Sequence, residues 1–349
     1  MRAAPPPGRA VRRPRIRWGT DIGGNDRPSV RTGRASARTP WTSPEGDPDP
    51  VPTWRATLTA AQLTDPALRA DCTAAARRVL RREQAPYLAL RLLAAPELQP
   101  WLTAGLAFMN LVDDVAESGV PGALEALTGR VDRVLAKGDD PDPVLRAYAH
   151  AVAERGLPTE WVTRFLAGAG TAEAGFAGFA TEADFQAYVD AYAWPGVVVF
   201  TGLQYPGGPD PEQAAGWRRF VDAAQRVDFL ADLAGDLGDG RLCLPAERLA
   251  AHGVSRADLE GAADTPAVRA LLAAECARAR EALTAAADVV ELAAPGLRPV
   301  GRVMTELMAH QLAAVERAGA GALRRDAGYG VVAPLRILGR AWRERRRAA

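Results

Sequence analysis

The strongest constraint on the fold is that, from about residue 54 onward, the chain consists of Ala- and Leu-rich segments with helical spacing of the apolar positions. Runs of β-branched residues, which strands favour, are scarce, and turn residues fall between the periodic segments. No segment of fixed length repeats, so a solenoid is not expected. The sequence therefore predicts an all-α fold, most simply a helical bundle around a central cavity.

Several helix starts are marked by capping residues. Asp-Pro pairs at 65–66 and 142–143 place a capping side chain before a proline in the first turn. Thr181, with Asp184 three residues later, resembles a capping box and starts a helix that should bend at Pro195. Further helices are expected at residues 98–117, 121–137, 160–180, 182–204, 211–237, 266–292, 297–318 and 323–345, with a short one after Pro245.

Composition bounds the setting in which the protein works. Residues 1–53 are rich in Pro, Arg, Gly and Ser without an apolar period, so we expect a disordered tail and a helical domain over 54–349. The 43 Lys and Arg nearly balance the 42 Asp and Glu, so no global field favours a nucleic-acid partner. The longest apolar run, residues 193–203, is too short to cross a bilayer, which leaves peripheral membrane contact as the most that is expected.

The three cysteines, Cys72, Cys243 and Cys276, lie far apart and lack CxxC spacing. They support neither a disulfide framework nor a zinc site. The natural compartment for such a chain is a reducing cytoplasm. A homodimer is compatible with this pattern, but no residue requires one.

A ladder of acids marks the most unusual helix. Asp228, Asp232 and Asp236 are four residues apart, so on a helix they stack along one face and repel one another. Asp236 also precedes Gly238 and Gly240, where the helix should end at the negative pole of its dipole. A bound cation, most simply a metal ion, would offset this repulsion.

A second acidic cluster, Asp113, Asp114 and Glu117, follows the almost wholly apolar segment 101–112 and precedes Gly119. A solvated helix end is the default explanation for one such cluster. Two of them in one chain suggest facing carboxylates with divalent ions between them. Mg²⁺ prefers carboxylate oxygens, water and substrate phosphates, so a diphosphate is the expected third party. The metal would help the diphosphate leave an allylic carbon chain.

An allylic cation needs a dry wall of aromatic rings. Aromatic residues lie on the segments that carry or follow the acids, namely Phe108, Phe176, Phe179, Tyr188, Tyr192, Trp194, Phe200 and Phe229. For each one alone, core packing is the better explanation. As a group they support a cavity that accommodates a cation.

These motifs resemble those of the squalene/phytoene synthase family of prenyltransferases, over roughly residues 73–340. The family's second aspartate-rich region and its Gly-Arg-x-x-Leu-Pro turn match Gln225, Asp228, Asp232, Asp236, Gly240, Arg241, Leu244 and Pro245. Its first aspartate-rich region matches Asp113, Asp114 and Glu117. The resemblance implies that the two regions face each other across a cavity and bind Mg²⁺ ions that hold an allylic prenyl diphosphate. It also implies that Arg241 holds the turn or the leaving diphosphate.

Three departures from the family pattern flank the acids. Asn110 and Ala231 stand where the family usually has Arg, and Gly235 stands where it often has Glu. A site for two diphosphates needs several cations, so the missing arginines favour a neutral acceptor, such as a small aromatic molecule. Asp190 then becomes a candidate base or acceptor anchor.

The expected site residues follow from this interpretation. The metal ligands are Asp113, Asp114, Glu117, Asp228, Asp232 and Asp236, and the catalytic acids are Asp113, Asp114, Asp232, Asp236 and Asp190. Substrate binding is expected from Asn110, Gln225, Arg226, Arg241, Phe108, Tyr188, Tyr192 and Trp194.

Three alternatives stay open. The first is condensation of two prenyl diphosphates, with Arg91 or Arg226 supplying the second diphosphate site. The second is a class I terpene cyclase, whose second metal motif uses Asn, Ser and Glu and lacks the GRLCLP turn. The third is a non-catalytic helical protein whose acids bind a cation or a basic partner.

Overall fold

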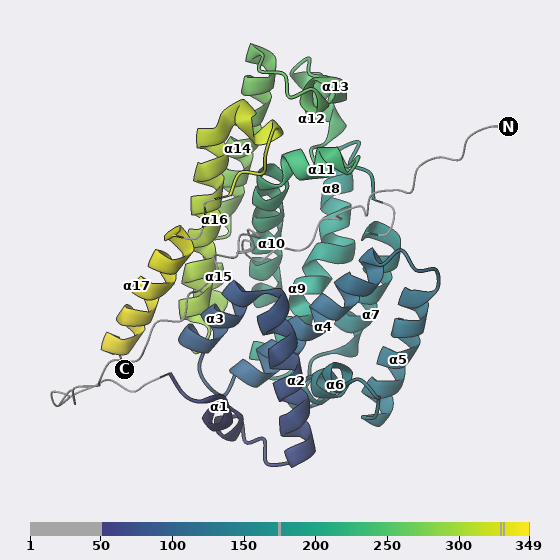
Figure 1. Ribbon diagram of the computed structural model, residues 1–349, viewed down its shortest axis with the longest axis vertical. Coiled ribbons are helices and arrows are strands. Elements are labelled where there is room, and N and C mark those ends of the chain that lie inside the picture. Colours follow the sequence, from purple (N-terminus) through teal and green to yellow (C-terminus); the bar gives the residue numbers. More distant parts are fainter. Residues whose placement is uncertain (1–50, 174–175, 329, 331, 349) are drawn as a thin grey trace, which may run out of the picture.

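The computed structural model describes residues 51–173, 176–328, 330 and 332–348 (Figure 1). In these residues every regular element is a helix, and extended backbone pairs only in an isolated parallel bridge between Gly178 and Leu242. The predicted all-α fold is therefore confirmed. The predicted disordered tail, residues 1–53, lies almost wholly outside the described residues and stays a prediction.

The first part of the chain forms α1 (Trp54–Ala60), α2 (Pro66–Arg82), α3 (Gln84–Leu93), α4 (Gln99–Glu117), α5 (Ala123–Lys137), α6 (Pro143–Arg155), α7 (Thr159–Gly168) and the π-helix η1 (Ala169–Glu173). Next come α8 (Glu182–Tyr188), the π-helix η2 (Val189–Ala193), α9 (Trp194–Thr201), the 3₁₀-helix η3 (Gly202–Gln204), α10 (Pro211–Ala231) and α11 (Leu233–Gly238). The last part forms α12 (Ala246–Ala251), α13 (Arg256–Glu260), α14 (Pro266–Ala285), α15 (Val289–Leu292), α16 (Arg298–Ala318), the 3₁₀-helix η4 (Gly319–Leu323) and α17 (Val332–Ala348).

The predicted caps hold the helix starts. The Asp65 and Asp142 side chains accept backbone N–H bonds from the first turns of α2 and α6, and a proline occupies the first position of each helix. Thr181 and Asp184 form a complete capping box at the start of α8. Each cap satisfies backbone donors that would otherwise lack a partner.

The acidic clusters lie at the ends of two long helices, α4 and α10, and α9 packs against both of them. In α4 all residues from Gln99 to Asn110 are buried, and the helix packs against α2, α6 and α9. The other acidic helix, α10, packs against α14 and α16 as well as α9. Figure 1 shows α5, α6 and α7 on one side of this arrangement, α16 and α17 on the other, and α11, α12 and α13 toward one end.

Several predicted helices are shorter than expected. The α-helix predicted over 160–180 ends at Gly168 and is followed by the π-helix η1, whereas Gly178 lies in the bridge to Leu242. The helix predicted over 266–292 divides into α14 and α15, and the one predicted over 323–345 starts later, as α17. Helices α1, α3 and α13 were not predicted.

The predicted bend at Pro195 lies elsewhere. Pro195 occupies an N-terminal position of α9, where its missing N–H costs no hydrogen bond, and the irregular backbone is the π-helix η2 before it. There α7 approaches closely, because a Cβ on Gly168 would lie 2.0 Å from the Ala191 carbonyl oxygen. Among the described residues, no helix is both long and apolar enough to cross a membrane.

Candidate active site

Asp113 is the buried member of the first acidic cluster. It lies near the C-terminal end of α4 with 2% of its surface exposed, and its Oδ1 accepts a hydrogen bond of 2.8 Å from the Tyr192 hydroxyl. Burial raises the pKa of Asp113 to about 7, although the Tyr192 hydrogen bond and the charge of Arg82 act in the opposite direction. Burial therefore favours the protonated form of Asp113. A cation beside it would favour the ionised carboxylate.

Asp114 makes different contacts. Its side chain is 42% exposed and forms ion pairs with Arg78, at 2.5 Å, and with Arg82, both from α2. Glu117, half-buried one turn beyond Asp113, lies close enough for its charge to raise the pKa of Asp113 further. The first cluster thus combines the buried carboxylate of Asp113 with the exposed carboxylate of Asp114, which two arginines contact.

The acid ladder is not one continuous helix, which corrects the prediction. Helix α10 ends at Ala231 and α11 begins only after Asp232. A regular helix would bond the Gly235 N–H to the Ala231 carbonyl. Instead, the Gly235 N–H donates to Oδ1 of Asp326 at 2.9 Å, and the Ala231 carbonyl accepts from the Ala327 N–H at 2.8 Å. The segment before α17 thus satisfies both backbone groups that the break exposes.

Asp236, the last acid of the ladder, is buried on α11. Its Oδ2 has no hydrogen-bond partner within the described residues. Burial raises its pKa to about 6, against a hydrogen bond from Cys243 and the charge of Arg241, while Asp326 nearby raises the pKa further. This unpaired oxygen is available to a ligand.

Arg241 lies in the turn after α11 and is also buried. Its Nη1 donates to Oε1 of Glu173 at 3.1 Å, and its guanidinium lies over the Phe176 ring, 4.6 Å from the centroid. Its Nε and Nη2 have no partner among the described residues. Gly240 makes the turn possible with φ +77°, and two guanidinium nitrogens remain available for an anion.

A row of contacts connects the two acidic helix ends. Tyr192 donates to Asp113, and Tyr188 donates through its hydroxyl to Oε2 of Glu173 at 2.9 Å, while Glu173 pairs with Arg241. The rings of Tyr188 and Tyr192 lie 5.7 Å apart. Asp113 and the turn that carries Arg241 therefore border one site.

The acids fit a magnesium site only in part. No three Asp, Glu, His or Cys side chains of the described residues come close enough to form a metal site by themselves. Mg²⁺ commonly uses one or two carboxylates together with water and phosphate oxygens, so a complete protein cage is not required. Hard carboxylate oxygens and the unpaired Oδ2 of Asp236 suit such an ion when a diphosphate completes its ligands.

A small apolar pocket, with a cavity volume of about 50 Å³, lies between α3, α4, α9, α10 and α16. It includes Leu106 on α4 and Phe220 on α10, each about two helical turns, or roughly 11 Å, before the acids of its helix. The pocket is lined by Pro86, Ala89, Leu90, Leu102, Leu106, Phe200, Thr201, Trp217, Phe220, Leu297, Val300, Gly301 and Met304. An apolar chain whose polar end lies near the acids would extend toward this pocket.

Comparisons with known proteins agree with this arrangement. The model of the squalene/phytoene synthase family matches residues 79–328, which include both acidic segments and the turn at Arg241. The chain belongs to the squalene/phytoene synthase family. It is therefore a prenyltransferase of isoprenoid biosynthesis, and the non-catalytic alternative is excluded.

One curated relative is a phytoene synthase of Thermus thermophilus, 31% identical over 198 residues, which are 56% of this chain and 67% of that protein. The squalene synthase HpnC of Alicyclobacillus acidocaldarius has a similar fold, with a TM-score of 0.67 and 23% identity over 74% of this chain and 98% of that one. A dehydrosqualene synthase in complex with ligand has a TM-score of 0.68 and 17% identity, covering 84% of this chain and 100% of that one. These two likenesses support the family's helical fold.

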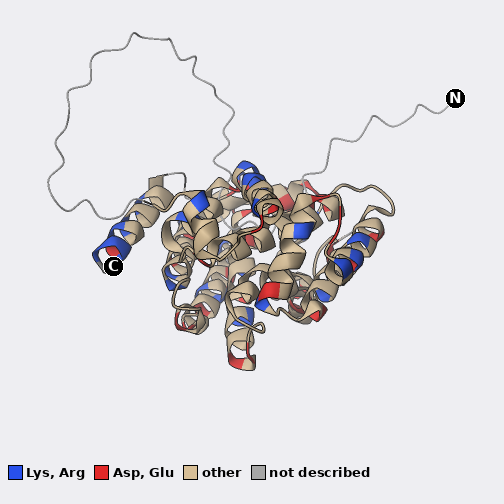
Figure 2. Ribbon diagram, turned by 90° about the horizontal axis from the view of Figure 1, so that it is seen from below, with Lys and Arg blue, Asp and Glu red and all other residues tan. Residues whose placement is uncertain are grey.

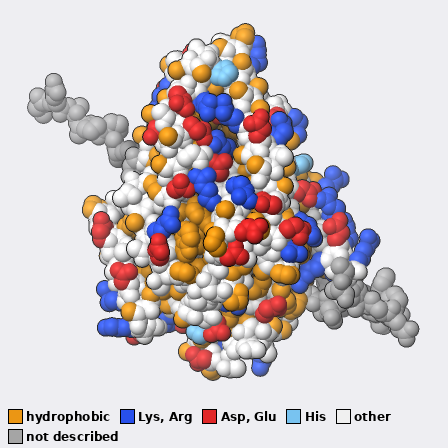
Figure 3. All heavy atoms as spheres, turned by 180° about the vertical axis from the view of Figure 1, so that it is seen from behind, with side chains coloured by type: hydrophobic (Ala, Val, Ile, Leu, Met, Phe, Trp, Pro, Cys, Tyr) orange, Lys and Arg blue, Asp and Glu red, His pale blue; other side chains and the backbone are white. Residues whose placement is uncertain are grey.

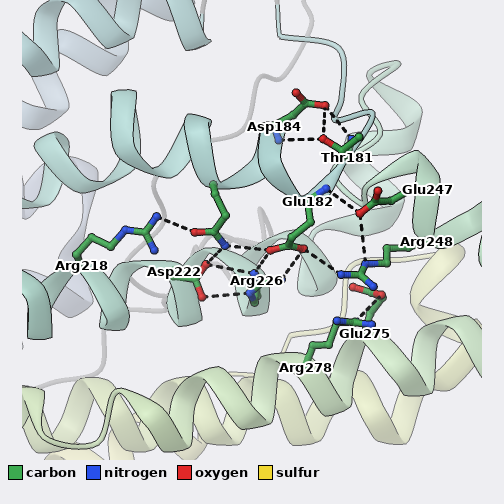
Figure 4. Close-up of polar contacts among 11 residues, drawn as sticks. Thr181, Glu182, Asp184, Arg218, Asp222, Arg226, Glu247, Arg248, Glu275 and Arg278 are labelled. Atoms are coloured by element: carbon green, nitrogen blue, oxygen red, sulfur yellow. Dashed lines mark hydrogen bonds and ion pairs between the residues drawn. The ribbon is translucent and has the colours of Figure 1, made fainter.

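The structure does not bring all predicted substrate-binding residues of this prenyltransferase to the acids. Arg226 pairs with Glu182 and with Asp222, at 3.2 Å for the latter (Figure 4). Its guanidinium also lies over the Phe185 ring. Asp190 is 57% exposed and accepts from Nε of Arg218 at 2.9 Å. Arg226 thus joins α8 to α10, and the contacts of Asp190 give no support for a role as a base.

Other predicted residues are buried within the helices. Asn110 is fully buried, and neither side-chain atom has a partner among the described residues. Gln225 is buried on α10, and Trp194 makes an edge contact with Trp161. Phe108 stacks on Tyr148 with ring centroids 3.9 Å apart. Phe108, Tyr188, Tyr192 and Trp194 are not among the residues that line the apolar pocket.

Four residues of the site region were missed from the sequence. Arg78 and Arg82 contact Asp114, and their spacing of four on a predicted helix could have identified them as one charged face. Glu173, an acid in the small-residue segment AGTAEAG, could have been noted as unusual. Asp326 gave no signal, because only the tertiary fold brings it to Gly235.

Proposed function

We propose that the protein condenses two allylic prenyl diphosphates head to head. The observation that carries this proposal is the pair Arg78 and Arg82 beside Asp114. The two arginines expected at positions 110 and 231 are absent, and this absence was the reason to predict a neutral aromatic acceptor. Because α2 supplies two cations at the first acidic cluster, that reason no longer holds. The match to a phytoene synthase also favours condensation over an aromatic acceptor.

The residues would divide the chemistry as follows. Carboxylates of the two helix ends, Asp113, Asp114 and Glu117 on one side and Asp228, Asp232 and Asp236 on the other, would hold Mg²⁺. When bound, the metal supplies positive charge that stabilises the departing diphosphate. The unpaired Nε and Nη2 of Arg241 and the buried amide of Asn110 offer further hydrogen bonds to diphosphate oxygens.

The bond changes in the proposed condensation are balanced. The C1–O bond of one prenyl diphosphate breaks, and its electron pair leaves with diphosphate. The double bond of the second prenyl diphosphate attacks C1. One proton then passes to the released diphosphate as a cyclopropane closes, and the product retains the second diphosphate. Burial raises the pKa values of Tyr188 and Tyr192 well above the usual range, so both phenols stay protonated and present neutral rings to the cation.

The test is product analysis from single substrates. The purified protein is incubated with Mg²⁺ and dimethylallyl, geranyl, farnesyl or geranylgeranyl diphosphate, and the products are identified by mass spectrometry. We expect a coupled product with twice the carbon count of one substrate and without any added acceptor. A cyclised hydrocarbon of unchanged carbon count would indicate a terpene cyclase, and a product that forms only with an aromatic extract would restore the acceptor hypothesis.

Variants connect this outcome to the residues. The double variant Arg78→Gln/Arg82→Gln should lower coupling roughly 10- to 100-fold, because a hydrogen bond to a charged group contributes about 1.5–3 kcal/mol. Arg77→Gln/Arg81→Gln, which removes two exposed arginines from the same helix, is the matched control. Asp113→Ala and Asp232→Ala should each abolish product. Equal activity of the two double variants would remove the support that Arg78 and Arg82 give to a second diphosphate.

A further inference from the structure

Helix α17 carries a stripe of arginines on its exposed face. Arg336, Arg340, Arg343 and Arg347 follow the spacing i, i+4, i+7 and i+11, which places them on one side of the helix, and all four are exposed. Like charges one turn apart destabilise a helix. Figure 2 shows the C-terminal part of α17 as predominantly basic where it projects at the edge of the molecule. Ion pairs with Glu306 and Glu344 give Arg340 a structural role, which leaves Arg336, Arg343 and Arg347 as the arginines of the stripe still to be explained.

The opposite side of α17 is fixed to the protein. The helix packs against α16 and α3, and Ile337 is 5% exposed on the packed side. Nη1 of Arg345 donates to the backbone carbonyl of Leu92, at the end of α3, at 2.7 Å. On the stripe itself, Arg340 pairs with Glu306 of α16 and with Glu344 of α17, at 3.7 Å for the latter, so its charge is partly neutralised. The helix therefore presents its arginine stripe in a defined direction.

Apolar side chains adjoin the stripe. Val332 is 61% exposed and Leu335 is 58% exposed, both in the first turn of α17, and both are among the most exposed large hydrophobic residues of the described chain. A helix with a basic face and exposed aliphatic side chains beside it is typical of helices that lie in the interface of a bilayer. Nucleic acid would match the arginines but not Val332 and Leu335.

The position of α17 is related to the apolar pocket. The two helices on which it lies, α3 and α16, contribute Ala89, Leu90, Val300 and Met304 to the wall of that pocket. Leu88 on α3 is itself 39% exposed. A binding partner in contact with α17 would therefore lie near the pocket wall that α3 and α16 form. By contrast, basic and acidic side chains lie next to each other on the face seen in Figure 3.

We propose that α17 docks the protein on a bilayer that contains anionic phospholipid. The arginine stripe contacts the lipid headgroups, and Val332 and Leu335 enter the boundary of the acyl chains. This docking brings the wall formed by α3 and α16 toward the lipid, from which a long-chain apolar compound can enter or leave the pocket. The docking itself does not depend on which prenyl products the protein makes.

The test uses the full chain and sedimentation with vesicles, without any substrate. We expect binding to vesicles of phosphatidylcholine and phosphatidylglycerol in a 7:3 ratio, weak binding to phosphatidylcholine alone, and weaker binding as salt rises. Arg336→Gln/Arg343→Gln should reduce partitioning about 30-fold, at about 1 kcal/mol per charge near an anionic surface. Leu335→Ser should reduce it as well.

The matched control is Arg133→Gln/Lys137→Gln on α5, which removes the same charge from an exposed position on another helix and should bind like the wild type. Circular dichroism melting establishes that each variant is folded. Wild-type binding by a folded Arg336→Gln/Arg343→Gln variant would overturn the proposal. Binding to duplex DNA as tight as to the anionic vesicles, with the same dependence on Arg336 and Arg343, would also overturn it and assign the stripe to nucleic acid.

Discussion

At the scale of single residues, burial of the Asp113 carboxyl group lowers the stability of the folded protein. The pKa of its carboxyl group rises from 3.8 to about 7 on burial. A folded-state pKa above the unfolded value lowers stability at high pH, because ionisation is easier in the unfolded chain. The resulting loss in the free energy of unfolding reaches its full value of ~4 kcal/mol above about pH 7, and it disappears toward about pH 4.

Replacing Asp113 with Asn should therefore stabilise the metal-free protein at high pH. The amide oxygen can still accept the Tyr192 hydrogen bond while the buried charge is removed. We expect Asp113→Asn to melt above the wild type at pH 8, and the difference to shrink by more than half at pH 5. Thermal unfolding in the presence of a chelator measures both values.

Asp114→Asn is the matched control for this prediction. Asp114 is 42% exposed and paired with Arg78 and Arg82, so its replacement removes favourable ion pairs without relieving burial. It should not raise the melting temperature at pH 8. A difference between Asp113→Asn and the wild type that stayed constant from pH 5 to pH 8 would contradict the assigned cause.

The sequence predicted the residue types of the site better than their contacts. The acids were predicted from their spacing and their position at helix ends, and Arg241 from the resemblance to the family's Gly-Arg-x-x-Leu-Pro turn, all of which are local features of the sequence. Tyr188 and Tyr192 were predicted as lining rings, whereas in the structure their hydroxyls donate to Glu173 and Asp113. Such pairings join residues far apart in the chain and leave no trace in helical periodicity.

At the scale of elements, the break between α10 and α11 determines where Asp236 points. Capped helix starts were predicted correctly, since a cap is local. The break was not, because its cause is the backbone and side chain of 326–327, about ninety residues away. Gly235 suits this arrangement, since a Cβ there would lie 3.2 Å from a carboxylate oxygen of Asp326.

Asp326→Ala should therefore affect activity more than stability. It removes the acceptor of the Gly235 N–H at an exposed position, which costs about 1 kcal/mol of unfolding free energy. We expect a larger loss of product formation and a higher Mg²⁺ requirement, because α11 and Asp236 lose their fixed direction. Asp326→Asn keeps an acceptor oxygen and should restore the Mg²⁺ requirement toward the wild-type value.

Melting curves and Mg²⁺ titrations of both variants separate the two effects. If Asp326→Ala lost stability but kept the wild-type Mg²⁺ requirement, Asp326 would be only a structural bond. If Asp326→Asn behaved like Asp326→Ala, the charge rather than the hydrogen bond would be the important property.

At the scale of the whole molecule, the helical bundle and its family were predictable, whereas the pocket was not. Helical periodicity fixes which face of each helix is buried, but not which buried faces leave space between them. Of the aromatic residues predicted to line a cavity, Phe200 is the one that lines the pocket. Trp217 and Phe220, which were not predicted, also line it, because α9 and α10 pack together there. Chain length therefore has to be tested through the pocket itself.

Ala89 offers that test, since it lies on α3 with 6% exposure and lines the pocket. Ala89→Phe would place a ring in the pocket, at a cost in stability of about 1–3 kcal/mol from overpacking. In a mixture of the four prenyl diphosphates, we expect its products to shift toward shorter chains, as measured by mass spectrometry. Leu88→Phe, at the neighbouring 39% exposed position outside the pocket lining, should leave the product distribution unchanged. An unchanged distribution from folded Ala89→Phe would mean that the prenyl chain occupies another part of the bundle, because a filled pocket cannot also accept the end of a long chain.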